Sequence, residues 1–451
     1  MISAMMINRY NSMEYFFRMD LLSKTRRQNP ELVKAAASLH RSGEIPADTY
    51  AIDLDMIRNN SDKLYHEATR HGLTNYMCVK QFGRNPLACK AIMNSGIRQA
   101  MAHDIEGAKN LHRHGIPIGH VGHFGQIPTS ELRYVLEKIR PDVITVFSVE
   151  KAKQISDMAS KLKVKQGLLL KIVDDPRLEL LMVGGGFTEE EAIDAARQIQ
   201  RMDNVSVAGL TAYPAFVFSI FNKTYQVSAN FKTMMRSAKR LEKELGIKVE
   251  QINAAGRNSV ENMELAAQMG ATHVEPGHSF IGTLPCFALL ENSAEIPAVV
   301  YVTEVSHFFS GHALAFGDSY MTTVGFGSVK SDIMYEYVSA CVGNDPDTLL
   351  ENVVPARPQY LPHDDSGWFL YCALVPDREK VIKVGDTVIL SFRPQVFRTP
   401  KGRVAVIGGI HKGKPRLLGL FDRTGMLIDR EDDGPVGYDR SKTLQLMNEI
   451  K

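Results

Sequence analysis

Lys80 and two glycine-containing segments are the parts of this sequence whose residue types and spacing suggest amine and phosphate chemistry. Lys80 directly follows the apolar residues Cys78 and Val79. If these residues end a strand at the mouth of a barrel, partial burial favours the uncharged lysine amine, which is the form that makes a Schiff base with a carbonyl group. Taken alone, the pattern also fits a solvated strand end, so the assignment depends on the other segments.

Two segments that follow apolar runs have the features of a phosphate site. The first, 253–259 (NAAGRNS), opens a helical pattern, and the second, 275–279 (EPGHS), contains a glycine turn. Small residues let the backbone approach an anion, and a helix N-terminus presents free N–H groups to it. Two ordinary turns that need glycine are the alternative. The predicted phosphate-binding residues are Gly256, Arg257, Asn258, Ser259, Gly277, His278 and Ser279.

Glu275 adds a third chemical element, because it directly follows the apolar run 271–274. A carboxylate at the end of a barrel strand could pair with a protonated pyridine nitrogen and strengthen the ring as an electron sink. A lysine on one strand, a phosphate cradle on two others and this carboxylate together predict a site for pyridoxal 5'-phosphate.

Alternating strand and helix patterns predict the scaffold that brings these segments together. Strand-like apolar runs occur at 76–79, 97–102, 116–121, 143–147, 167–173, 205–212, 249–252 and 271–274. Between them lie helical patterns, at 86–94, 105–114, 149–162, 188–201, 229–245 and 260–269. Eight such repeats are what a (β/α)8 barrel requires, and barrel active sites lie at the C-terminal ends of the strands. An open doubly wound sheet is the alternative, but it usually has fewer strands.

The sequence predicts three consecutive parts. Residues 1–47 form an N-terminal extension with short amphipathic helices, residues 48–297 form the barrel, and residues 298–451 form a mostly β C-terminal domain. The last assignment rests on short apolar runs separated by Gly, Pro and Asp, a pattern typical of β-structure. These runs are at 299–305, 314–316, 320–324, 369–374, 388–392 and 404–407.

The bulk composition is that of an ordinary globular protein. The 451 residues are 44% hydrophobic and 23% charged, and the net charge of +2 gives no reason to expect nucleic acid or an anionic membrane as a partner. Five cysteines lie far apart without CxxC spacing, which fits a reducing compartment. We therefore expect a cytoplasmic protein that interacts with neither nucleic acid nor a membrane.

With these motifs in place, the chain resembles the fold-type III pyridoxal-phosphate enzymes, the superfamily of alanine racemase and ornithine decarboxylase, and most of all its YhfX-like branch. The likeness covers most of residues 48–420. Its markers are 51–55 (AIDLD), 79–80 (VK), 103–108 (HDIEGA), 211–213 (TAY), 253–259 and 275–282.

The resemblance implies roles for individual residues. Lys80 would carry the cofactor as a Schiff base and exchange protons at the substrate Cα, and Tyr213 would lie near the cofactor ring. The substrate would be an amino acid. Members of the family act as dimers whose active sites borrow residues from the partner's β-domain, so a homodimer is also implied.

Three departures from the racemase pattern are visible in the sequence. Glu275 stands where alanine racemase has an arginine, and the glutamate form resembles the decarboxylases. Phe316 takes the place of the tyrosine that acts as second base, so His312 or Tyr320 would have to supply that function. The arginine that binds the substrate carboxylate is replaced within 184–187 (GGGF), where Arg177 could compensate.

No metal is expected from the sequence. His120 and His123 are three residues apart without a nearby third ligand, which is more typical of residues that line a site or support the structure. The stretch 394–397 (PQVF) has neither the histidine nor the cysteine of the zinc pair that some relatives carry.

These observations predict a pyridoxal-phosphate-dependent enzyme that acts at the Cα of an amino acid, with racemisation as the first hypothesis. Decarboxylation is the alternative that Glu275 and Phe316 favour, and a lyase reaction follows it. A non-catalytic pyridoxal-phosphate carrier is a rival from another class, although such carriers usually lack a second domain. A barrel enzyme that acts on a sugar phosphate is the remaining alternative.

Overall fold

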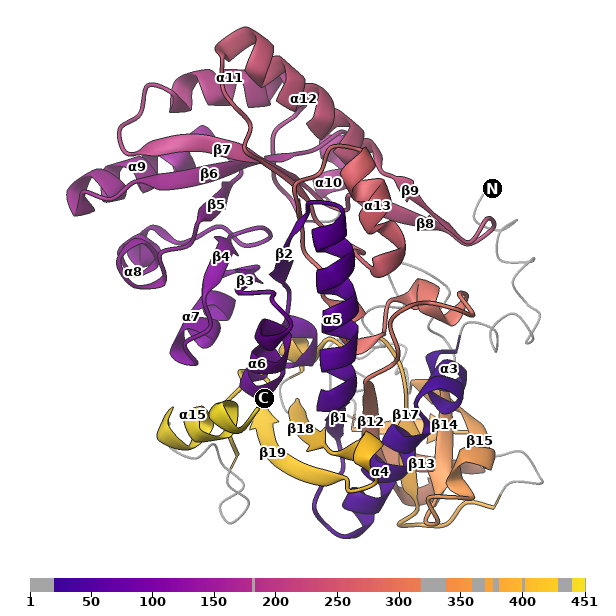
Figure 1. Cartoon of the computed structure of the whole chain (residues 1–451). Coiled ribbons are helices and arrows are strands. Elements are labelled where there is room, and N and C mark those ends of the chain that lie inside the picture. The colour runs from indigo at the N-terminus through magenta and orange to yellow at the C-terminus, as the bar shows by residue number, and fades with distance from the viewer. Residues whose placement is uncertain are drawn as a thin grey trace. The chain divides into compact units, whose positions relative to one another are not determined.

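The computed structural model describes residues 20–180, 183–317, 338–358, 370–375, 381–399, 402–428 and 440–450. The chain divides into two compact units (Figure 1). The barrel unit comprises residues 61–79, 89–279 and 443–451, and the sheet unit comprises residues 1–60, 80–88 and 280–442. The predicted strand at 320–324 and Tyr320 lie outside the described residues.

The barrel unit contains a closed parallel barrel, as the sequence predicts. Its strands follow one another around the barrel in chain order, and β7 pairs with β10 before β11 returns to β2. The strands are β2 (Thr74–Met77), β3 (Gln99–Ala102), β4 (Ile118–Val121), β5 (Val143–Val146), β6 (Gln166–Ile172), β7 (Val205–Ala212), β10 (Gln251–Ala254) and β11 (His273–Val274). The eight predicted runs all lie in barrel strands, with bounds that differ by a few residues, so the open-sheet alternative is wrong.

Helices alternate with these strands, and their starts follow from local capping chemistry. Ser148 accepts a hydrogen bond from the Lys151 backbone N–H, and Thr188 forms a capping box with Glu191. In Figure 1, α9, α11 and α12 lie outside strands β5 to β7. The helices around the barrel are α5 (Leu54–Arg70), α6 (Pro86–Asn94), α7 (Ile105–Arg113), α8 (Leu132–Tyr134), α9 (Val149–Leu162), α10 (Pro176–Leu180), α11 (Glu189–Ile199), α12 (Ala229–Leu245) and α13 (Val260–Gln268).

The sheet unit contains a nine-stranded sheet in the order β13-β16-β15-β14-β17-β12-β1-β18-β19. Because β12 also pairs with β13, six of the strands form a closed ring, in the order β13-β16-β15-β14-β17-β12. The strands are β1 (Thr49–Asp53), β12 (Val299–Phe309), β13 (His312–Phe316), β14 (Val338–Gly343), β15 (Val353–Pro358), β16 (Tyr371–Leu374), β17 (Thr387–Leu390), β18 (Arg403–Gly408) and β19 (Arg416–Asp422). A mostly β second domain is therefore confirmed.

One predicted boundary is wrong. Residues 48–53 were assigned to the barrel, but β1 pairs antiparallel with β12 and parallel with β18 in the sheet unit. All five residues of β1 are buried, which is the environment of a central strand with neighbours on both sides. β1 therefore belongs to the sheet unit, and α5 leads from it into the barrel unit.

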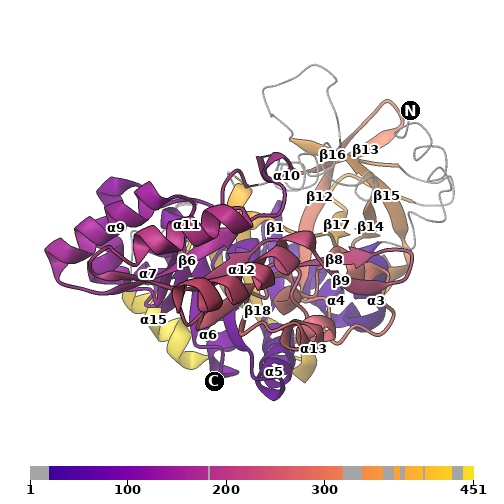
Figure 2. The same ribbon diagram turned by 90° about the horizontal axis from the view of Figure 1, so that it is seen from above.

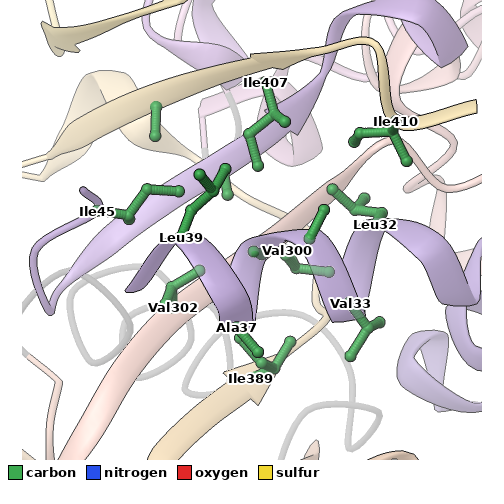
Figure 3. Packing of buried hydrophobic residues seen from close by; sticks show 14 of the residues in the cluster. Leu32, Val33, Ala37, Leu39, Ile45, Val300, Val302, Ile389, Ile407 and Ile410 are labelled. Carbon is green, nitrogen blue, oxygen red and sulfur yellow. The ribbon is translucent and has the colours of Figure 1, made fainter. Parts of the chain in front are cut away.

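The predicted N-terminal helices are α3 (Leu21–Gln28) and α4 (Pro30–Arg41), and they cover the sheet rather than forming a separate extension (Figure 2). The apolar face of α4, including Leu32, Val33 and Leu39, packs against Val300 of β12 and Ile407 of β18 (Figure 3). Each such buried side chain contributes about 1.5–3 kcal/mol relative to an exposed one. This packing makes the N-terminal helices part of the sheet unit's core.

The sequence analysis missed a short hairpin in the barrel unit. Strands β8 (Phe216–Ser219) and β9 (Thr224–Val227) pair antiparallel between β7 and α12. The strand-like apolar runs predicted from the sequence do not include this hairpin. None of the helices in the described ranges is both long and apolar enough to cross a lipid bilayer.

Candidate functional site

The centre of the site is the carboxylate of Glu275, which directly follows β11 and is almost completely buried in the barrel unit. His120 of β4 places its Nδ1 atom 2.5 Å from Glu275 Oε1. Asn253 of β10 donates a hydrogen bond from Nδ2 to the same oxygen at 2.7 Å. Burial of an unpaired carboxylate costs free energy, and the contacts with His120 and Asn253 offset that cost for Glu275.

The surroundings keep Glu275 ionised. Burial acts to raise its pKa, but the charges of His120 and His123 and the hydrogen bonds from His120 and Asn253 together lower the pKa below its ordinary value. A neighbouring positive charge and donated hydrogen bonds both favour the charged form of a carboxyl group. The site therefore presents a fixed negative charge at the end of a barrel strand.

His120 is itself held from its other side. Its Nε2 atom lies 2.5 Å from the hydroxyl of Thr145 on β5, and the imidazole is fully buried. Thr145, His120 and Glu275 thus form a chain of contacts that crosses the barrel interior from β5 to β11. This chain fixes the position of the carboxylate.

The second oxygen of Glu275 is differently placed. Oε2 is buried and has no hydrogen-bond partner among the described residues, although His123 Nδ1 lies 3.6 Å away. A buried acceptor without a hydrogen bond costs free energy unless a ligand supplies the donor. This atom therefore fits a ligand that carries an N–H group.

His120, His123 and Glu275 also meet the distance criterion for a metal site, since one ligand atom from each lies within 4.8 Å of the others. The spacing of His120 and His123 in the sequence does not by itself predict that Glu275 joins them. Both nitrogens of His120, however, already make close contacts with Glu275 and Thr145. We interpret the cluster as a hydrogen-bonded network, and the expected absence of a metal stays a prediction.

The two predicted phosphate loops are joined to each other. Asn258 accepts a hydrogen bond at Oδ1 from the Glu275 backbone N–H at 3.0 Å and donates one from Nδ2 to the Ala254 carbonyl at 2.9 Å. The Ser279 hydroxyl donates to the Asn258 carbonyl. The side chain of Asn258 therefore holds the loops together, which leaves its backbone as the part that could contact a phosphate group.

Gly256 and Arg257 shape the first loop. Both have left-handed backbone conformations, with φ of 99° and 58°. A side chain at position 256 would meet the ring of Tyr213 at 2.8 Å, so only glycine leaves this space open. Arg257 is exposed, and its carbonyl accepts a hydrogen bond from Asn262 of α13 at 2.8 Å. The loop thus leads into α13, whose N-cap residue is the buried Ser259.

Tyr213 belongs to a wall of rings at the C-terminal ends of the barrel strands. Phe124 lies 4.7 Å from Tyr213 and 4.9 Å from His123, measured between ring centroids, with edge-to-face geometry in both pairs. His103, after β3, lies 4.5 Å from Phe124. Such a wall suits one face of a flat aromatic ligand. The placement of Tyr213 beside a ring-binding site remains a prediction.

Lys80 is the first residue of the short 3-10 helix η1 (Lys80–Phe82). Two residues, Cys78 and Val79, separate it from the end of β2. Lys80 belongs to the sheet unit, where its Nζ atom lies 4.6 Å from the ring centroid of Phe397. Two residues earlier, the Cys78 backbone N–H donates to the Pro276 carbonyl at 2.9 Å, which ties the end of β2 to the loop that carries Glu275. This hydrogen bond therefore links the loop that carries Glu275 to the segment that directly precedes Lys80.

Other predicted residues have different environments. His312 starts β13 in the sheet unit, and its Nδ1 atom contacts the Ser310 carbonyl at 3.0 Å. Tyr320 lies outside the described residues. The side chain of Arg177 is 91% exposed and pairs with Asp175. This environment does not support a role for Arg177 in place of the carboxylate-binding arginine. Phe316 lies beside Tyr371, with ring centroids 5.8 Å apart.

The sequence analysis missed the roles of His120, Thr145 and Asn253. Two of them interrupt runs that are otherwise apolar or small, His120 in 118–121 (IGHV) and Asn253 in 252–255 (INAA). A polar side chain inside a barrel strand needs a buried partner, and that signal could have linked them to Glu275. The sequence could not identify which strands face one another across the barrel.

His273 lies next to this network and stays uncharged. Burial, opposed by the charge of Glu275 and reinforced by that of His120, lowers the pKa of His273 from 6.5 to about 4. Its ring lies 5.3 Å from that of Tyr76, whose own pKa is raised by burial. His273 and Tyr76 are therefore two neutral aromatic groups beside the network.

Comparison with protein families agrees with this geometry. The alanine racemase N-terminal domain family matches residues 52–285, and the YhfX-like C-terminal domain family matches residues 300–417. The uncharacterised protein YhfX of Escherichia coli K12 is 31% identical over 400 residues, which is 89% of this chain and 97% of that protein.

Solved structures show the same fold at low sequence identity. Alanine racemase of Clostridium difficile 630 aligns with a TM-score of 0.58 and 14% identity, over 84% of this chain and 99% of that one. D-threonine aldolase of Filomicrobium marinum gives 0.62 and 12%, over 85% and 95%. D-threo-3-hydroxyaspartate dehydratase of Delftia sp. HT23 gives 0.59 and 13%, over 83% and 97%.

The contact between His120 and Glu275 predicts strong energetic coupling. His120→Gln or Glu275→Gln alone should lower the free energy of unfolding by about 3 kcal/mol, because each leaves a buried partner uncompensated. The double variant should lose less than the sum, with a coupling energy of about 1–3 kcal/mol. Urea unfolding of the cofactor-free protein measures these values.

The exposed pair Arg133–Glu137, treated in the same way, should couple by less than about 0.5 kcal/mol. Additive effects at His120 and Glu275 would contradict the network.

His273 predicts a loss of stability in acid. Unfolded chains protonate this histidine below pH 6.5, whereas the folded protein resists protonation until about pH 4. Its contribution is therefore complete above pH 6.5 and falls by roughly 2–3 kcal/mol as the pH drops toward 4. His273→Gln should flatten the pH dependence of the unfolding free energy across this range. The exposed His66→Gln serves as control, and equal slopes in both variants would rule the explanation out.

Proposed function

We propose that this chain, which belongs to the alanine racemase family and carries a YhfX-like C-terminal domain, is a pyridoxal-phosphate-dependent enzyme that acts at the Cα of an amino acid. Racemisation of the amino acid is the first form of the proposal. Members of the family use pyridoxal phosphate, and the structurally similar proteins include a racemase, an aldolase and a dehydratase.

The observation that carries the proposal is the buried, ionised carboxylate of Glu275 with one oxygen lacking a hydrogen bond. A protonated pyridine nitrogen is a flat donor that such an oxygen accepts well. The loop conformation at Gly256 and the helix N-terminus at Ser259 offer a place for a phosphate group. The residues present therefore fit the cofactor at both ends.

Pyridoxal phosphate, when bound, supplies an electron-accepting ring that weakens the bonds at the Cα of an amino acid. Lys80 is the residue proposed to hold it covalently and to move a proton at Cα. Glu275 would hold the proton on the ring nitrogen. The backbone of 256–259 and 277–279 would bind the phosphate, and the ring of Tyr213 would lie against the cofactor.

Two features favour a second candidate, a decarboxylase or lyase. An ionised Glu275 would favour a protonated ring nitrogen and so a stronger electron sink, which suits these reactions. Phe316 has no proton to donate, and its ring neighbour Tyr371 belongs to a different strand. A second acid or base, if the reaction needs one, is proposed to be His312 or Tyr320.

We further propose a homodimer in which the β-domain of one protomer contributes His312 or Tyr320 to the partner's site. A non-catalytic carrier is the rival proposal. The second, β-sheet unit favours an enzyme over a carrier, because a carrier needs only the cofactor-binding barrel.

The first experiment is the absorption spectrum of the purified protein with pyridoxal phosphate, before and after borohydride, followed by peptide mapping. The label should be on Lys80. Lys171 is the competing lysine, because its burial lowers its pKa although its pairing with Glu179 acts in the opposite direction. Lys80→Ala should lose the label, whereas the exposed Lys153→Ala should keep it. A label on Lys171, or an unlabelled protein that cannot be reconstituted, would contradict the proposal.

The reaction class follows from a screen of amino acids in deuterium oxide. Racemisation predicts deuterium at Cα together with loss of optical activity, and Glu275→Ala should reduce the rate by at least about tenfold while some cofactor binding remains. Release of carbon dioxide, or of a carbonyl product, would assign the second candidate instead. A coloured protein that promotes none of these changes would support the carrier.

A further inference from the structure

The barrel unit contains a second buried charged pair, which the proposed chemistry does not use. Lys171 is the second-last residue of β6, and Glu179 lies on α10 in the connection that follows. The Lys171 ammonium donates a hydrogen bond to Glu179 Oε1, and the two side chains are 0% and 3% exposed. The ring of Phe147, directly after β5, has its centroid 4.9 Å from Lys171 Nζ. The pair is therefore shielded from water at the C-terminal ends of β5 and β6.

The strand register places Lys171 on the interior side of the barrel. Lys171 pairs with Thr211 of β7, and Thr211 pairs with Asn253 of β10. Residues paired across neighbouring strands have their side chains on the same face of the sheet. Asn253 donates to Glu275 inside the barrel. The Thr211 hydroxyl likewise lies 3.4 Å from His123 Nδ1. Lys171 therefore faces the interior that contains the Glu275 network, at the end of the barrel where active sites lie.

Backbone hydrogen bonds hold the two charged residues in this arrangement. The Gly184 N–H donates to the Glu179 carbonyl at 2.9 Å, and the Phe187 N–H donates to the Lys171 carbonyl at 2.8 Å. The glycine segment 184–187 is thus connected to both members of the pair. The ammonium and the carboxylate are therefore set in place before any ligand arrives, which lowers the entropic cost of binding one.

Neither charged group has all of its hydrogen-bonding capacity used. A lysine ammonium carries three N–H donors, and within the described ranges the only hydrogen-bond acceptor of Lys171 is Glu179 Oε1. The other carboxylate oxygen, Glu179 Oε2, is buried and accepts no hydrogen bond from the described residues. A buried polar atom without a partner costs free energy unless a ligand supplies one. The pair thus offers a ligand one acceptor and up to two donors, on atoms of opposite charge.

We propose that Lys171 and Glu179 bind the side chain of the amino-acid substrate and select one that ends in a carboxamide. This inference rests on the proposed function, because it names the class of amino acid on which that chemistry would act. The carbonyl oxygen of a carboxamide accepts a hydrogen bond from Lys171, and its NH2 group donates one to Glu179 Oε2. A side-chain carboxylate is repelled by Glu179, and a side-chain ammonium is repelled by Lys171. The pair has no net charge, so it favours an uncharged polar group.

The test measures dissociation constants of amino acids for the protein loaded with pyridoxal phosphate, from the change in its absorption spectrum. The matched sets are glutamine, glutamate and methionine, and asparagine, aspartate and leucine. In at least one set the carboxamide should bind about tenfold more tightly than the other two members, because a hydrogen bond to a charged group contributes at least that factor to affinity.

Two single variants should change this preference in opposite directions. Glu179→Gln leaves the Lys171 cation without a negative partner, so the carboxylate should now bind about tenfold more tightly than the carboxamide. Lys171→Met leaves the Glu179 anion, so ornithine or lysine should be preferred instead. Asp157→Asn, at the exposed ion pair with Lys153, is the control and should leave every preference unchanged.

A double variant covers the case in which a single variant does not fold. Lys171→Met combined with Glu179→Met removes both charges, and apolar residues commonly replace a buried ion pair without loss of stability. This protein should fold, as urea unfolding can check, and should bind methionine at least as tightly as glutamine.

Opposite shifts in the two single variants would support the inference, because a purely structural pair would change the binding of all amino acids alike. Equal changes across each set, or a double variant that keeps the preference for the carboxamide, would overturn it. A wild-type preference for charged or apolar members would also overturn it, yet would leave the proposed function standing. A wild-type protein that does not bind pyridoxal phosphate would refute the proposed function itself, which separates the two conclusions.

Discussion

The need to bury the negative charge of Glu275 is the constraint on which the rest of the site depends. A carboxylate in the barrel interior is tolerated only if other buried groups compensate it. Here the compensation comes from His120 and Asn253, with Thr145 supporting His120. These groups are on β4, β5 and β10, so closure of the barrel is what creates the network. Any rearrangement of one of these strands would leave an uncompensated charge.

The same constraint reaches the predicted phosphate loops. The backbone N–H of Glu275 is held by Asn258, which in turn is contacted by Ser279. The carboxylate end and the phosphate end of the proposed cofactor site are therefore one connected structure. Preorganisation of this kind limits the conformational entropy that a ligand must overcome on binding. The side chain of Asn258 makes these contacts between the loops.

The charge of the network bears on chemistry within the family. In the proposed function, an ionised Glu275 would make the bound ring a stronger electron sink than a neutral or cationic partner would. The fold is shared by racemases, aldolases and dehydratases among the similar structures, so the fold does not select the reaction. That selection depends on individual residues such as Glu275 and Phe316.

The sequence by itself determined the barrel, the β-domain and the two loops, because apolar periodicity and glycine turns are local signals. Strand 205–212 and helices 86–94, 149–162 and 229–245 were predicted with the bounds that the structure has. Only the tertiary structure decided the place of β1 in the sheet unit and the partners of Glu275. These depend on which strands are neighbours and which side chains meet across a closed barrel. That information is held in contacts between residues far apart in the sequence, which no local pattern encodes.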